Sequence, residues 1–151
     1  MIFLNDQTPE AQLLHVCDAL DVSDIACVPF EEETLTGNIT KETTFPEGDW
    51  SNLYFVPENL NPSVERADLL KTIFLEGMTM PDMVLRFILN HLALSTTMLG
   101  MRKINHEKAN IADGDGKRLA NKLLTQLNYH RWDRIPTSWS DEYLKLKKLI
   151  L

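Results

Sequence analysis

Residues 95–112 read STTMLGMRKINHEKANIA, and the fold assignment depends on this stretch. A short strand is predicted over Leu94–Leu99, followed by the basic pair Arg102 and Lys103 and by a helix that opens near Asn105. Asn105 is the expected N-cap, because its side-chain oxygen can accept a hydrogen bond from an unpaired amide of the first turn. Free N–H groups and partial positive charge at a helix start attract anions. The residues predict either a phosphate site between strand and helix or an ordinary joint with a solvated basic pair.

The composition bounds the class of protein. The chain has 151 residues, a length typical of one domain with its own core. Its fractions of 44% hydrophobic and 25% charged residues are those of a soluble globular protein. The net charge of -7 argues against nonspecific binding to nucleic acid or to a membrane surface. No apolar run approaches the roughly 18 residues of a spanning helix.

The cysteine pattern and the first residues bear on the compartment. The N-terminus has no basic region followed by an apolar block, so no secretory signal is expected. Cys17 and Cys27 fit two free thiols in a reducing cytosol, and we predict a cytoplasmic protein. The histidines and cysteines are scattered without the spacing of a metal site, so no metal is predicted.

Periodic apolar residues predict the surrounding elements. A helix is expected to begin at Thr8–Pro9 and a buried strand to span Asp24–Phe30. Further helices are expected from Asn61–Pro62 to Gly77, after a capping box at Thr79 and Asp82, and after Asp115. The apolar positions expected to face the core are Leu13, Leu14, Cys17 and Leu20; Val64, Ala67, Leu70 and Phe74; Val84, Leu85, Ile88, Leu89 and Leu92; and Leu119, Leu123, Leu124 and Leu127.

Several further segments extend the pattern of residues 95–112: VPFEEETLTG at 28–37, MPDMVLRFILNH at 80–91 and HRWDR at 130–134. Together they resemble the C-terminal half of the aldo/keto reductases, from about Phe3 to Ser140. The resemblance implies an α/β fold: a partial (β/α)8 TIM barrel with about three parallel strands, flanking helices and a C-terminal helical extension. It divides the chain into residues 1–140, which are reductase-like, and a tail at 141–151. About 250 residues are normally needed to close such a barrel.

The resemblance also implies an NADP site at the carboxyl end of the last strand. In that family this segment binds the 2′-phosphate and the adenine, and an earlier loop covers the diphosphate. The residues that match these positions are Gly100, Met101, Arg102, Lys103, His106, Asn110, Thr36 and Gly37. Gly100 would let the backbone come close to the ligand.

Two loops leave alternatives open. Glu33 stands where the family has glycine, and a third carboxylate near a diphosphate is electrostatically unfavourable. Residues 31–33 are therefore either part of the ligand site or a solvated acidic loop. Between residues 38 and 61, Trp50, Tyr54 and Phe55 either line a substrate pocket or pack into the protein.

The resemblance places the catalytic tyrosine, lysine, aspartate and histidine of the family before the part matched here. Tyr54, Tyr129 and Tyr143 have no recognisable lysine and aspartate to tune them, so no catalytic residue is assigned. The chain is predicted to be an NADP-binding fragment of a reductase whose family reaction is carbonyl reduction by hydride transfer. The alternatives are a non-catalytic interaction module and one subunit of a split barrel, which would associate with itself or with a partner chain through exposed sheet edges.

Overall fold

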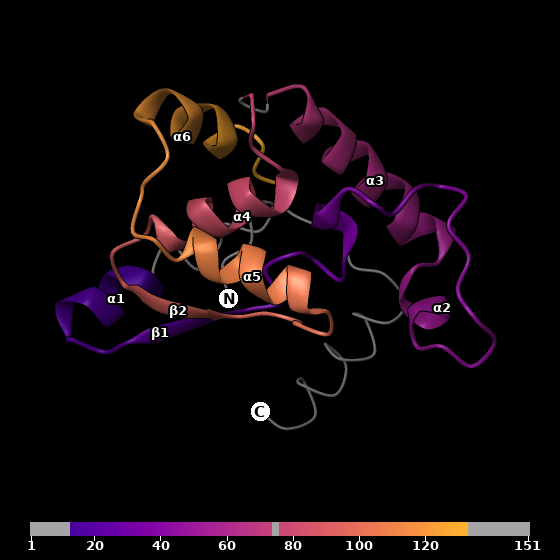
Figure 1. The fold of residues 1–151 in the computed structure, drawn as a ribbon, viewed down its shortest axis with the longest axis horizontal. Helices are drawn as coiled ribbons and strands as arrows, with labels where there is room; N and C mark the ends of the chain where they lie inside the picture. Colours follow the sequence, from indigo (N-terminus) through magenta and orange to yellow (C-terminus); the bar gives the residue numbers. More distant parts are fainter. Residues whose placement is uncertain (1–12, 74–75, 133–151) are drawn as a thin grey trace.

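The computed structural model describes residues 13–73 and 76–132 (Figure 1). The elements, in chain order, are α1 (Leu13–Ala19), β1 (Asp24–Cys27), the 3-10 turn η2 (Thr34–Thr36), α2 (Ser51–Tyr54), α3 (Pro57–Lys71), α4 (Met80–Leu89), β2 (Leu94–Met98), α5 (Ile104–Asp113) and α6 (Asn121–Asn128). The expected helix start at Thr8–Pro9, Phe74 and the tail lie outside the described residues.

The two described strands form a parallel sheet. Ile25 is paired with Thr96 and Cys27 with Met98, with an irregularity in the register after Asp24. The Thr97 hydroxyl donates to the Ala26 carbonyl at 3.0 Å and adds a side-chain bond across the pair. The α/β architecture with parallel strands and flanking helices is confirmed, and any strand in residues 1–12 lies outside the described part.

Helix α4 packs on the sheet through its apolar stripe, and both this stripe and the N-terminal cap of the helix are those expected from the sequence. The Thr79 hydroxyl accepts from the Asp82 amide at 3.3 Å, and the Asp82 carboxylate accepts from the Thr79 amide at 2.9 Å. This capping box satisfies amides that a helix start otherwise leaves unpaired. Val84 and Ile88 are fully buried in the main core, but Leu92, expected on the same stripe, is 74% exposed because the helix has already ended at Leu89.

Helix α3 begins earlier than expected. It starts at Pro57, whose ring fixes a helical backbone angle and which needs no N–H partner at this position. Pro62, expected near the helix start, lies inside it, and the helix ends at Lys71 well before Gly77. The predicted inward positions Val64, Ala67 and Leu70 are buried.

The segment between η2 and α3 builds a second, smaller core. Phe45 and Phe55 stack with their ring centroids 5.2 Å apart, and Phe55 is 7% exposed. Tyr54 packs against the same cluster, and Trp50 stacks on Tyr54 at 5.1 Å while remaining 44% exposed. The packing interpretation therefore holds for Tyr54 and Phe55.

Two further helices differ from the sequence patterns at their ends. In α1, Leu14 is fully buried and Leu13 is exposed, and Leu20 lies beyond the helix end and is exposed as well, so the buried apolar face is narrower than expected. Asp115 does not cap α6, which begins at Asn121 after Ala120. The expected inward leucines of this region are nevertheless buried or partly buried: Leu119, Leu123, Leu124 and Leu127.

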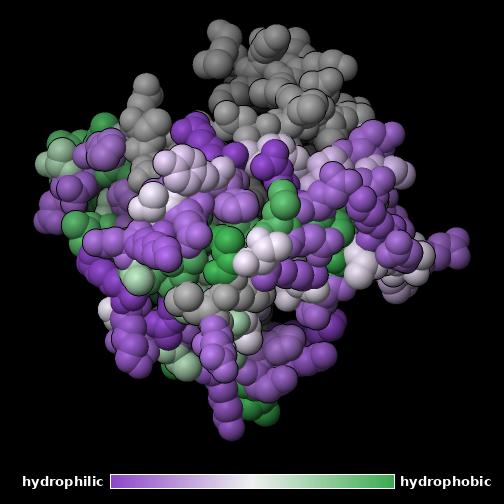
Figure 2. Space-filling view, turned by 90° about the horizontal axis from the view of Figure 1, so that it is seen from above, coloured by the Kyte–Doolittle hydropathy of each residue, from purple (hydrophilic) through white to green (hydrophobic). Residues whose placement is uncertain are grey.

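The surface over α3, α4 and α6 is mostly hydrophilic in the view from above, with hydrophobic atoms showing between the polar side chains (Figure 2). Within residues 13–73 and 76–132, none of the helices combines the length and the apolar character needed to cross a membrane.

Candidate functional site

The carboxyl ends of β1 and β2 define the candidate site. The strands run parallel, and their last paired residues are Cys27 and Met98. The segment that follows β1 and leads to η2 therefore starts at the same edge of the sheet as the segment that joins β2 to α5 (Figure 1). Ligands of parallel α/β sheets bind outside the carboxyl ends of the strands. The two segments matched to NADP binding thus begin side by side.

The start of α5 differs from the expectation in a way that bears on anion binding. The helix begins at Ile104 with Lys103 as its N-cap, and Asn105 lies inside the first turn. Lys103 has an extended backbone and its side chain makes no capping hydrogen bond. A helix of this kind leaves first-turn amides without a side-chain acceptor, and the macrodipole favours a negative group there. The prediction that Asn105 caps the helix was wrong, but the open helix start remains.

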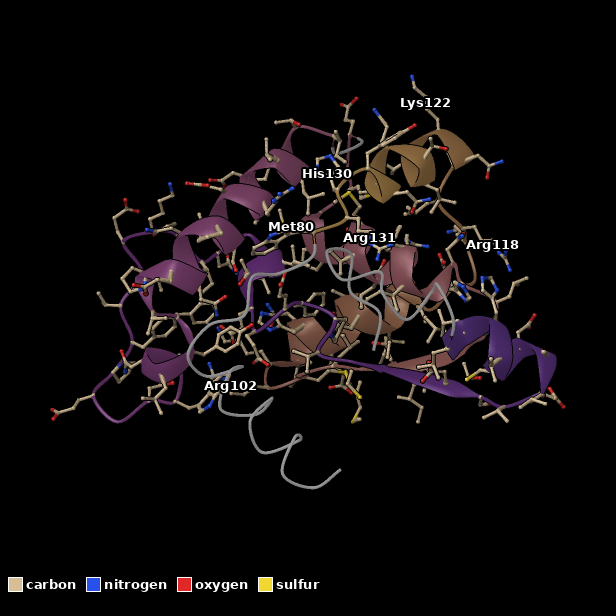
Figure 3. The ribbon with its side chains drawn as sticks, turned by 180° about the vertical axis from the view of Figure 1, so that it is seen from behind. Met80, Arg102, Arg118, Lys122, His130 and Arg131 are labelled. Carbon is tan, nitrogen blue, oxygen red and sulfur yellow. The ribbon has the colours of Figure 1, made fainter. Side chains whose placement is uncertain are left out.

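Arg102 and Lys103 bring full positive charge to this helix start. Both side chains are exposed, and within the described residues neither has a recorded hydrogen bond or ion pair. Arg102 lies in the turn between β2 and α5, on the side of α2 (Figure 3). The basic pair is therefore not neutralised by a described carboxylate, as a phosphate site requires.

The other predicted residues of this segment lie in the turn before α5 or on α5 itself. His106 is exposed and Asn110 is half-buried, and their spacing of four places them on one face of α5. Met101 is 50% exposed. A Cβ placed on Gly100 would meet no described atom within 4 Å, so the surrounding protein does not require glycine here. Their roles toward NADP stay predictions.

Thr36 and Gly37 shape the loop after β1. The Thr36 hydroxyl donates to the Glu33 carbonyl at 2.7 Å, which closes the turn on itself. Gly37 has φ 79°, a left-handed conformation that glycine adopts without strain, and its amide donates to the Thr34 carbonyl. We interpret both residues as determinants of loop geometry in addition to their predicted place near the diphosphate.

The acidic loop at residues 31–33 has the left-handed backbone that glycine favours, although Glu33 stands where the family has glycine. Glu31, Glu32 and Glu33 have φ values of 49°, 52° and 74°. Left-handed backbone costs a non-glycine residue about 1–2 kcal/mol. Glu31 is 7% exposed, so the interpretation of a fully solvated acidic loop was wrong for this residue, whereas Glu33 is exposed. Glu33 therefore combines a strained backbone with a negative charge, in the loop that the resemblance matches to the diphosphate.

A charged network that the sequence reading missed holds α5 against α4. Arg86 forms ion pairs with Asp113 at 3.1 Å and with Asp115 at 2.7 Å, and it donates to the Lys117 carbonyl at 3.0 Å. Asp115 also pairs with Lys117 at 2.9 Å. The sequence offered two signals: an arginine within the apolar stripe of α4, and the acidic turn at residues 113–116.

The same network perturbs its carboxyls in opposite directions. Burial raises the pKa of Asp113 to about 6, and the adjacent Asp82 carboxylate adds to this shift against the opposing charge of Arg86. Burial also acts on Asp82, but hydrogen bonds from Thr79 and Asp113 outweigh it and lower its pKa. Hydrogen bonds from Arg86 and Lys117 lower the pKa of Asp115. Asp113 is the group of this network that titrates near neutral pH.

No catalytic residue emerges from the described part of the chain. Tyr54 packs in the smaller core and stacks on Trp50, and Tyr129 is 84% exposed. Tyr143 lies outside the described residues. In the ranges 13–73 and 76–132, no three His, Cys, Asp or Glu side chains come together in a group that could hold a metal ion.

Comparisons with known proteins connect this geometry to one family. The family model for the aldo/keto reductase family matches residues 1–132. An aldo-keto reductase from Bacillus halodurans is similar in structure in its apo form, with a TM-score of 0.60 and 17% identity, and the match covers 91% of this chain and 44% of that chain. Its holo form matches with the same TM-score and identity and is covered to 43%.

The glycerol dehydrogenase of Gluconobacter oxydans is also similar, with a TM-score of 0.68 and 19% identity, over 89% of this chain and 43% of that chain. The sequence matches no curated protein. At these identities the structures show the fold, and this chain spans less than half of their length. The strands and helices described above correspond to part of a reductase barrel, and the family model extends over most of the 151 residues. The chain belongs to the aldo/keto reductase family.

Proposed function

We propose that this chain forms the NADP-binding part of an aldo/keto reductase barrel. The observation that carries the proposal is the uncapped start of α5, with the unpaired basic side chains of Arg102 and Lys103 directly before it. The open amides and the guanidinium favour a dianionic group such as the 2′-phosphate, which NADP has and NAD lacks. His106 and Asn110 lie on the same helix and would contact the adenosine.

The family reaction then follows from the cofactor. Bound NADPH supplies a hydride to a carbonyl carbon, and this chain would hold the nucleotide at the edge where β1 and β2 end. The loop closed by Thr36 and Gly37 would cover the diphosphate, although Glu33 opposes it electrostatically. The acid–base residues of carbonyl reduction are not among those we assign. In this proposal residues 1–140 form the reductase-like unit and residues 141–151 an added tail. The two free thiols support a location in the reducing cytoplasm.

Binding of NADP and NAD to the full chain, measured by calorimetry, tests the proposal. Arg102→Ala should weaken NADP binding by about 10- to 100-fold, the usual value of a charge-assisted phosphate contact. NAD binding should hardly change, because NAD has no 2′-phosphate. Lys122→Ala is the matched control, since Lys122 lies on α6 and points away from the protein (Figure 3). Equal losses for NADP and NAD, or no loss in R102A, would contradict the assignment of Arg102.

A second candidate function is that of a subunit or interaction module that docks on a partner chain. Exposed apolar side chains favour it: Ile25 on β1 is 49% exposed, Met98 on β2 is 60% exposed, and Ile104 and Ile111 on α5 are 71% and 65% exposed. Such surface next to strand edges promotes association. Sedimentation of the purified chain over a range of concentrations tests this. A monomer at every concentration would count against self-association, and NADP binding by that monomer would favour the first proposal.

A further inference from the structure

A pocket lies at the opposite edge of the sheet from the candidate NADP site. It has a volume of about 430 Å³ and is bounded by α1, the end of α4, the loop between α4 and β2, and α6. His91 and Ala93 line it, and they directly precede β2, so the pocket sits at the amino end of that strand. Ligand sites for small molecules typically occupy about 300–1,000 Å³. The pocket is therefore separate from the proposed function and large enough for a small ligand.

The pocket contains both signs of charge. Arg118 contributes a guanidinium and Asp18 a carboxylate. Arg118 lies on the segment before α6 and above α1 (Figure 3). The nearby Asp115 is engaged with Arg86 and Lys117 instead. In the described part of the chain, neither Arg118 nor Asp18 has a recorded ion pair, so each remains able to bind an opposite charge of a ligand.

A further donor comes from His91. Its Nδ1 accepts the Ala93 amide at 3.3 Å. In the neutral ring the hydrogen is then on Nε2, which makes Nε2 a donor. Apolar side chains from three elements also line the pocket, namely Leu14 of α1, Phe87 of α4 and Leu124 of α6. The polar side chains of His15, Asn90 and Asn128 lie among them.

We propose that this pocket binds a small zwitterion, a free α-amino acid with an apolar side chain. Its carboxylate would pair with Arg118 and accept from His91 Nε2, and its ammonium group would pair with Asp18. Its side chain would lie against Phe87 and Leu124, which are both partly exposed. Both charged side chains are exposed and hydrated without a ligand. A zwitterion can pair with both of them, whereas an anion or an amine can pair with only one.

Three probes of one shape test this on the full chain at constant ionic strength: L-leucine, 4-methylpentanoate, which lacks the ammonium group, and 3-methylbutylamine, which lacks the carboxylate. Inorganic phosphate is the fourth probe. Binding is followed by ¹H–¹⁵N NMR at the Ala93 amide and at the Arg118 guanidinium. Leucine should saturate at millimolar concentrations and bind at least about tenfold more tightly than either fragment, as expected for a second charge-assisted contact.

Variants locate the site. Arg118→Ala and Asp18→Asn should each weaken leucine binding at least about tenfold. Lys122→Ala, which removes the same charge from the same region, should leave it unchanged. NADP affinity should be unaffected by all three, so failure here would leave the NADP proposal standing. The inference is overturned if leucine does not saturate, if 4-methylpentanoate or phosphate binds as tightly as leucine, or if R118A binds leucine like the wild type. If R118A does not fold, the comparison of the four probes on the wild type decides.

Discussion

The charged residues at the α4–α5 junction form ion pairs, whereas the basic residues at the carboxyl edge of the sheet are exposed and unpaired among the described residues. At the junction, Arg86 pairs with both Asp113 and Asp115, and the Arg86 side chain is only 15% exposed. At the carboxyl edge, Arg102 and Lys103 are exposed without a recorded partner among the described residues, and Glu33 is held in a left-handed conformation. Ion pairs between α4 and α5 fix how these helices meet. Unpaired charges and a strained backbone remain available to interact with a ligand.

The junction and the carboxyl edge should therefore respond differently to substitution. Substitutions at the junction should change the free energy of unfolding. They should change nucleotide affinity only through that loss of stability. Changes at the carboxyl edge should alter nucleotide affinity with little loss of stability, or with a gain.

Arg86→Ala should produce the largest loss of stability, about 3 kcal/mol, because it leaves the buried Asp113 carboxyl without its cationic partner. Urea unfolding followed by circular dichroism measures it. Lys41→Ala is the control, since the Lys41–Glu65 pair at 2.7 Å has both side chains largely exposed, 44% and 62%. Exposed pairs contribute only about 0–1 kcal/mol. Similar losses in R86A and K41A would refute a special role for the junction.

Asp113→Asn should change the pH dependence of stability. The folded pKa of Asp113, about 6, lies above its usual 3.8, so the folded state holds the proton more tightly. The resulting stabilisation is complete below about pH 4 and is lost as pH rises through about 6, with a total of at most about 3 kcal/mol. Unfolding free energies between pH 4 and 8 should fall with pH in the wild type and fall less in D113N. Parallel curves would show that Asp113 does not titrate in this window.

Glu33→Gly, at the carboxyl edge of the sheet, should stabilise the protein and tighten NADP binding. Glycine adopts φ 74° without strain, so E33G should stabilise the protein by about 1 kcal/mol. Loss of the carboxylate should also tighten NADP binding. Glu33→Gln separates the two effects, since it removes the charge and keeps the Cβ: it should tighten binding without the gain in stability. A destabilised E33G, measured by thermal unfolding, would contradict the assignment of strain to this backbone.

Thr79→Ala should destabilise the protein by about 1 kcal/mol, because it removes the hydroxyl that accepts from the Asp82 amide. Thr79→Ser keeps the hydroxyl and should retain most of the stability. NADP affinity should be the same in both variants, as measured by calorimetry. If serine costs as much as alanine, the capping box does not stabilise α4.

The local signals in the sequence predicted the elements best where a cap and an apolar stripe coincide. For α4, the threonine, the aspartate three residues later and the buried Val84 and Ile88 were all confirmed. Where only one signal was present, the boundaries moved. Pro62 was expected to start a helix, but Pro57, five residues earlier, has the same fixed backbone angle and is the first residue of α3. Asn105 was expected to be the N-cap of α5, but Lys103 occupies that position.

The candidate site was predicted as a set of residues but not as a geometry. The order of strand, turn and helix at residues 94–113 was correct, and because β1 and β2 are parallel, the segment that leads from β1 to Thr36 and Gly37 starts at the same end of the sheet as the segment that joins β2 to α5. The sequence did not indicate that three successive glutamates would adopt left-handed conformations. Such a backbone is imposed by the packing on either side of the loop, not by the propensity of glutamate.

By itself, the sequence determined the family, the parallel α/β character and the helix with the strongest cap, because those depend on neighbouring residues and on apolar periodicity. Only the tertiary structure decided which charges meet. Arg86 and Asp115 are 29 residues apart and bond at 2.7 Å, while Arg102 and Lys103 stay exposed. Ion pairing depends on the relative placement of whole helices, and no local pattern of residues specifies that placement.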